Sequence, residues 1–161
     1  MKSTITTNAP EEYDEFMSFT TKEIKKVIIA GIKKGLALIR TAGRASLRSA
    51  MGSAASHHNP KYNDTLIQGV RNTRVIDKND GNPYGYVTIT SNRKAGSGSY
   101  RLIFFEGGTV QRFTSKGYNR GSLKALFFFS DAVSQTEGQV QTAIDNGISD
   151  AVDKINRRKN D

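Results

Sequence analysis

The sequence contains no cysteine, which excludes disulfides, thiolate zinc sites and cysteine nucleophiles together. It also lacks a long apolar run: the longest stretches, residues 27–32 and 126–129, fall far short of the roughly 18 to 20 residues of a membrane-spanning helix. The first twenty residues hold an acidic cluster where a secretory signal has basic and then apolar residues. We therefore expect no membrane span and no secretory signal.

The composition that remains is that of one folded domain. A length of 161 residues suits a single domain, and a hydrophobic fraction of 36% together with 15 glycines is close to the globular norm. We predict one domain over residues 1–161, with an acidic N-terminal segment at 1–15 and flexible basic loops at 91–99 and 110–122.

The net charge of +9 is unevenly distributed along the chain. Residues 1–21 carry −3 and residues 131–161 carry −2, whereas residues 22–48 carry +7 and the segments 49–101 and 102–130 carry +4 and +3. A basic middle suits contact with a polyanion. It equally suits a subunit whose acidic ends dock on the basic middle of a neighbouring copy.

Two long helices are predicted from hydrophobic periodicity. Pro10 with its acidic neighbours indicates a helix start, and a capping box at Thr20 and Glu23 indicates a second start or a kink. Apolar residues three or four apart then continue to Met51, and the small polar segment 52–60 is a linker. A C-terminal helix is expected from the Ser134-x-x-Glu137 capping box onward.

Between these helices the pattern favours strands. Residues 64–70 suit a short helix or a strand start, and residues 74–77 and 86–90 form a hairpin around the turn at 80–83. The apolar run 100–105 predicts a buried strand, and residues 125–129 are either a strand or the approach to the last helix. The expected fold is therefore α+β, with the long N-terminal and C-terminal helices packed on a small, mainly antiparallel sheet of about three to four strands.

The motifs of common catalytic and cofactor sites are missing. There is no Gly-x-Ser-x-Gly, no His-Glu-x-x-His and no Gly-Lys-[Ser/Thr], and Arg101 stands where a dinucleotide fingerprint starting at Gly96 has its third glycine. The adjacent His57 and His58 diverge on any regular element, so we interpret them as linker histidines rather than metal ligands. Glu106 has no second carboxylate beside it, and pairing with a basic neighbour is favoured over catalysis. We predict no enzyme, no cofactor and no metal.

Two basic segments have competing interpretations. The first helix carries a basic stripe that is either a solvated face, which is favoured because no aromatic residue is interleaved, or a track for phosphates. Its members are Lys26, Lys33, Arg40, Arg44 and Arg48. The loop at 112–121 interleaves cations and aromatics as single-strand binders do, but such loops also seat against neighbouring subunits.

Four segments of the chain follow one another in an order that matters for its classification: FTTKEIKKVIIAGIKKGLALI (19–39), NPKYNDTLIQGV (59–70), YRLIFFEGGT (100–109) and ALFFFSDAV (125–133). Their order and spacing resemble the neck proteins of long-tailed bacteriophages, a family of tail-completion or head-to-tail connector components. The segments look like that family's long N-terminal helix, its proline followed by Leu-x-x-x-[Ile/Val], its strand closing in Glu-x-Gly-Thr, and its approach to the last helix.

The resemblance implies a structural virion protein without catalysis, assembled in the host cytoplasm. Copies would form a ring in the neck, at the head-tail junction around the DNA channel, between a head-side, portal-proximal connector and a tail-tube or tail-terminator protein. On this hypothesis Phe104, Phe105, Phe127 and Phe128 lie in the core, and the basic stripe meets either channel DNA or a neighbour's acidic ends. The candidate subunit interface comprises Glu106, Gly107, Gly108, Thr109, Arg112, Phe113, Lys116, Tyr118 and Arg120. The competing hypothesis is a basic nucleic-acid-binding module that acts free of a virion.

Overall fold

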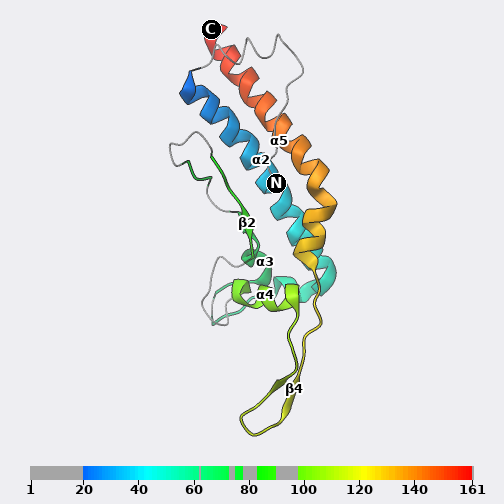
Figure 1. Ribbon diagram of the computed structural model, residues 1–161. Helices are drawn as coiled ribbons and strands as arrows, with labels where there is room; N and C mark the ends of the chain where they lie inside the picture. The colour runs from blue at the N-terminus through cyan, green and yellow to red at the C-terminus, as the bar shows by residue number, and fades with distance from the viewer. Residues whose placement is uncertain (1–19, 62, 73–74, 78–82, 90–97, 161) are drawn as a thin grey trace.

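A computed structural model describes residues 20–61, 63–72, 75–77, 83–89 and 98–160 of the chain. Two long helices dominate it: α2 (Thr21–Met51) and α5 (Phe128–Asn160) lie side by side along most of their length (Figure 1). They are antiparallel, because Gly31 of α2 meets Ile148 of α5 whereas Gly43, further along α2, meets Phe129 at the start of α5. The predicted α+β class and its two long helices are confirmed.

The ends of α2 follow from local sequence. The Oγ1 atom of Thr20 accepts a hydrogen bond from the Glu23 amide at 3.3 Å, and the Glu23 carboxylate accepts one from the Thr20 amide at 2.8 Å. This capping box is the predicted one, and it satisfies amide groups that the first helical turn leaves without partners. The helix ends before Gly52, whose φ of 58° is a backbone conformation that glycine tolerates. A 3₁₀ helix, η1 (Gly52–Ser56), begins the predicted linker. The helix start expected at Pro10 lies outside the described residues.

Glycines let α2 and α5 approach closely. A Cβ atom on Gly147 would lie 2.9 Å from the Cα of Gly31 and 3.2 Å from the carbonyl oxygen of Ala30. A Cβ atom on Gly31 would in turn lie 2.9 Å from the carbonyl oxygen of Ile144. Glycine costs a helix about 1 kcal/mol relative to alanine. Here that cost is offset by backbone contact that no larger residue permits.

The buried strand predicted for residues 100–105 is wrong, because this segment is the helix α4 (Gly98–Gly107). Leu102 is completely buried and Phe105 packs on the same core, as residues three apart on one helix face do. Tyr100 and Phe104, four apart, form an edge-to-face pair with ring centroids 5.2 Å apart. A short continuous apolar run has no periodicity that separates a buried strand from a buried helix. Packing against α3 decided the outcome.

The described strands form two separate two-stranded sheets instead of the one sheet of about three to four strands that was predicted. β1 (Arg71–Asn72) pairs antiparallel with β2 (Val87–Thr88), and an isolated bridge joins Ile76 to Tyr84. The predicted antiparallel hairpin is confirmed in part, because β2 lies within the predicted segment 86–90 whereas its partner β1 precedes the predicted segment 74–77. Residues 80–82 of the expected turn lie outside the described residues. The second sheet joins β3 (Arg112–Phe113) to β4 (Asn119–Gly121), inside the segment 110–122 expected as a loop. Of the other predicted loop, residues 91–97 lie outside the described part and residues 98–99 open α4.

The hydrophobic core lies where the C-terminal end of α2 meets α3 (Leu66–Gly69), α4 and the start of α5. Its buried members are Leu47, Ala55, Leu66, Ile67, Val70, Ile89, Leu102 and Phe128. Of the four phenylalanines expected there, Phe128 is buried and Phe105 packs against the cluster. Phe104 is half-buried. Phe127 is 55% exposed, so its placement in the core was wrong.

Candidate functional site

The basic stripe of α2 divides into two parts. Lys26 is exposed within the first two turns of the helix, and Lys33 is exposed near its middle. Arg40, Arg44 and Arg48, four residues apart, occupy the last third, where the chain leaves α3 and enters β1. Arg71 of β1 joins these three there, and we call Arg40, Arg44, Arg48 and Arg71 the arginine cluster.

Three guanidinium groups of the arginine cluster are fixed by hydrogen bonds. Arg40 donates from Nη1 to Oδ1 of Asn72 at 2.8 Å, and Arg44 donates from Nε to the carbonyl oxygen of Val70 at 3.1 Å. Arg71 donates from Nε to the carbonyl oxygen of Gln68 at 2.6 Å. Each contact uses one nitrogen of a planar fork that carries five N–H donors. The side chains are therefore held while most of their donors stay available.

The cluster borders an open concavity of about 480 Å³. Three members of the cluster line it, and the described lining residues are all polar or charged: Arg40, Arg44, Asn63, Gln68, Arg71 and Asn72. Gln68 and Asn72 already use their amide oxygens as acceptors, from Thr65 and from Arg40. Their amide nitrogens are the groups that can donate into the concavity.

The electrostatics of the cluster favour an anion. Partial burial, and then the three neighbouring guanidinium groups, lower the pKa of Arg44 from its ordinary value. Among the described residues, the ion pairs are Lys25 with Asp77 and Lys34 with Asp150, and none involves the cluster. Arginine stays protonated near neutral pH, so four like charges here repel one another. A bound anion would relieve that repulsion.

The sequence pattern found three members of this site and missed the rest. Arg71, Asn63, Gln68 and Asn72 come from a different part of the chain than the stripe, and no motif marks them. A basic residue beside a predicted hairpin was the only signal for Arg71. Its meeting with Arg40 and Arg44 depends on how α3 and β1 pack on α2.

The second candidate region is a hairpin arm, residues 109–123, that projects from the end of the molecule opposite the chain's C-terminus (Figure 1). The arm closes at its base, where the Thr109 amide donates to the Leu123 carbonyl oxygen at 2.9 Å. At its tip the Thr114 amide donates to the Tyr118 carbonyl oxygen at 2.8 Å. Val110, Phe113 and Tyr118 are 83%, 61% and 70% exposed. The predicted interface residues Arg112, Phe113, Lys116, Tyr118 and Arg120 all lie on this arm and are all exposed.

The four preceding interface candidates build the base of the arm. Gly108 has φ 71°, and a Cβ atom there would lie 2.8 Å from the Leu123 carbonyl oxygen, so glycine is required both by conformation and by space. Gly107 is the last residue of α4, and the Thr109 hydroxyl accepts a hydrogen bond from the Leu123 amide. These residues turn the chain from α4 into the arm.

Glu106 has a role that the sequence pattern did not reveal. Its carboxylate accepts hydrogen bonds from the amides of Phe129 and Ser130, each at 2.9 Å, and from the Ser130 hydroxyl at 2.5 Å. Phe129 and Ser130 are the second and third residues of α5, so Glu106 caps that helix from α4. The partner expected for Glu106 was a basic side chain, and the expected start of the helix was Ser134. The cap from α4 places the start at Phe128 instead.

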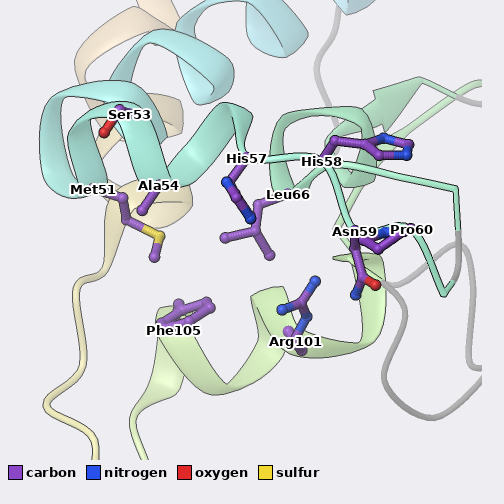
Figure 2. A pocket seen from close by; sticks show the side chains of 10 residues that line it. All are labelled: Met51, Ser53, Ala54, His57, His58, Asn59, Pro60, Leu66, Arg101 and Phe105. Carbon is purple, nitrogen blue, oxygen red and sulfur yellow. The ribbon is translucent and has the colours of Figure 1, made fainter.

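The two histidines line a cavity of about 590 Å³ between η1, the following linker and α4. Figure 2 shows His57 directed toward Leu66 and Arg101 rising into the cavity from α4, whereas His58 points away from His57. The two histidines lie in the linker after η1, outside any helix or strand, which is the linker position predicted for them. The Nε atom of Arg101 is buried without a hydrogen-bond partner. In the described part of the chain, no carboxylate lines the cavity and no group of three or more potential metal ligands occurs.

Comparison of the chain with models of known protein families, with curated proteins and with solved structures finds no match. Within the described ranges, neither α2 nor α5 nor any shorter helix combines the length and apolar character of a membrane span.

Proposed function

We propose that this chain is a structural protein of the neck of a long-tailed bacteriophage, where copies assemble into a ring between the head-side connector and the tail. The order of the four sequence segments supports the family, although the third segment, matched to that family's strand, is the helix α4 in this structure. The hairpin arm is the observation that supports assembly. The proposal assigns no catalysis to the chain.

The arm is poorly suited to exist alone. A two-stranded hairpin is marginally stable in water unless a further strand or a helix packs on it. In this arm Phe113 and Tyr118 stay largely exposed, and no described residue covers them. Aromatic and arginine side chains are enriched at protein interfaces, and this arm carries both. A partner surface would bury its aromatic side chains and fix its strands.

A second copy offers a surface of matching charge. The arm and the segment up to Ser130 carry four basic residues, Arg112, Lys116, Arg120 and Lys124, and no acidic residue. In α5, residues 131–153 carry five acidic residues and no basic one. At 3.6 residues per turn, Asp131, Asp145 and Asp153 fall on the side of α5 away from α2, and all three are exposed.

Docking of one copy's arm on the next copy's α5 joins two different surfaces. Such head-to-tail contacts produce a closed ring when the rotation between neighbours closes, and a filament when it does not. The opposite charges would also steer neighbouring copies and fix their register.

The assembly is tested with the purified full chain. The double variant Phe113→Ser with Tyr118→Ser should shift the mass, measured by light scattering after size exclusion, from oligomer to monomer. The control is Ile103→Ser, an exposed apolar position on α4 outside the arm. Equal assembly of the arm variant and the wild type would contradict the proposed interface.

A charge exchange tests the partner surface. Arg112→Glu with Arg120→Glu should prevent assembly, and adding Asp145→Lys with Asp153→Lys should restore it, because both sides of the contact are then reversed. Restored assembly is not expected if the acidic face of α5 is uninvolved. The neck location is tested by electron microscopy of phage particles that carry a tag on this chain. Complete head-tail junctions without label would contradict it.

The arginine cluster favours a second candidate, a basic nucleic-acid-binding module acting free of a virion. The two candidates differ in assembly: the module needs no oligomer to bind nucleic acid. If the purified chain stays monomeric at high concentration and still binds duplex DNA, the module is favoured.

A further inference from the structure

We infer that the arginine cluster, with the amide groups of Asn63, Gln68 and Asn72, is a binding site for the phosphodiester backbone of duplex nucleic acid. The site needs no second copy of the chain, so the inference does not rest on the proposed ring. It assigns the binding of a polyanion to one place on the molecule, rather than to the basic charge of the whole chain.

The donors of the site match phosphate. A guanidinium group presents paired N–H donors in a plane, which matches two oxygens of a phosphate. Arg40, Arg44 and Arg71 each commit one nitrogen to an acceptor within the chain, which fixes the orientation of the rest of the fork. Side chains that are already ordered lose less conformational entropy when a ligand binds.

The length of the cluster suits a polymer of phosphates rather than one ion. Arg40, Arg44 and Arg48 stand one above another on α2, and eight residues of helix rise by about 12 Å. Duplex DNA carries one charge per about 1.7 Å of its axis when both strands are counted, so this length of axis holds about seven phosphate charges on the two strands together. Four arginines can then each neutralise a phosphate without crowding.

The described lining of the concavity indicates the kind of nucleic acid. Proteins that hold single strands stack bases on aromatic rings, and none of the described residues that line this concavity is aromatic. Contacts from arginine and amide side chains to phosphate and sugar position a duplex without reading its sequence. We therefore expect little preference between sequences.

The test measures binding of the full chain to a labelled 20-base-pair duplex at several salt concentrations. With four phosphates neutralised, the affinity should fall by about 150-fold between 50 and 200 mM NaCl. Arg40→Ala with Arg44→Ala should reduce that fall to about 12-fold, and should weaken binding by about 60-fold at 100 mM NaCl. Circular dichroism of each variant establishes that it is folded.

The matched control removes the same charge from the other end of the same helix. Lys22→Ala with Lys26→Ala lowers the net charge by two at exposed positions and should change the affinity less than threefold. An equal loss in both double variants would overturn the inference, because binding would then follow net charge and not the site.

Two further measurements examine the chemistry of the ligand. Arg40→Lys with Arg44→Lys keeps the charge but removes the fork, so the salt dependence should persist while the affinity falls several-fold. Wild-type affinity in this variant would overturn the role of the guanidinium groups. Polyglutamate, or vesicles of phosphatidylglycerol, should compete poorly at equal charge. If either displaced the duplex at equal charge, the site would be one for acidic peptide or for lipid headgroups.

These outcomes are separable from the assembly of the chain. The arginine cluster lies on α2 and β1, and the arm follows α4. Loss of DNA binding with unchanged oligomeric mass in Arg40→Ala with Arg44→Ala would support the site alone. Loss of assembly with unchanged DNA binding in the arm variant would support the interface alone.

Discussion

Replacing Glu106 by alanine tests whether a side chain from α4 sets the start of α5. The variant removes a carboxylate that accepts two backbone amides and one hydroxyl from Phe129 and Ser130. Loss of a helix N-cap costs about 1 kcal/mol, and hydrogen bonds to a charged group contribute about 1.5 to 3 kcal/mol each when buried. Glu106 and Phe129 are only half-buried and Ser130 is exposed, so in the variant water replaces part of the lost hydrogen bonding. We expect a loss of about 2 kcal/mol in the free energy of unfolding.

For a chain of this length, 2 kcal/mol corresponds to a fall in Tm of about 4 to 8 °C. Glu106→Gln should lose about half as much, because its amide oxygen still accepts one backbone amide while the charge at the helix N-terminus is gone. Thermal unfolding followed by circular dichroism at 222 nm measures both variants, with urea unfolding as a second method.

The matched control is Glu137→Ala, which removes the same side chain from an exposed position within α5. This glutamate belongs to the Ser134 capping box that the sequence pattern predicted. We expect a change below about 0.5 kcal/mol, as at most surface positions. A larger loss in Glu137→Ala than in Glu106→Ala would refute the reasoning, because α5 would then begin at Ser134.

Two further predictions concern packing and a third concerns an ion pair, and each is measured by urea unfolding. Gly138→Ala should raise the free energy of unfolding by about 0.5 to 1 kcal/mol, because its Cβ atom meets nothing within 4 Å. Gly147→Ala in the same helix should lower the free energy of unfolding by about 1 to 3 kcal/mol, because its Cβ atom would clash with Gly31. If Gly138→Ala and Gly147→Ala both stabilised the chain, the close contact between α2 and α5 would be contradicted. Leu102→Ala should cost about 2 to 5 kcal/mol, whereas Ile103→Ala, 41% exposed, should cost less than about 1 kcal/mol. Lys34→Ala removes an ion pair with both partners more than half exposed and should change stability by less than about 0.5 kcal/mol.

Local signals in the sequence determined several features correctly. The capping box at Thr20 and Glu23 fixed the start of α2, and Gly52 fixed its end, since both act within four residues of the chain. The 3.6-residue spacing of apolar side chains predicted the body of both long helices. The missing cysteines and catalytic motifs could be read directly from the residues.

Tertiary structure decided the features in which residues distant in the sequence meet. The apolar run around Leu102 became a helix because packing against α3 selected it, and a run of that length has no periodicity of its own. The start of α5 depends on Glu106, which lies 23 residues before Phe129. The arginine cluster exists because the packing of α3 and β1 brings Arg71 to Arg40 and Arg44. Contacts within one helical turn are encoded where they act, whereas contacts across the fold depend on which surfaces pack together.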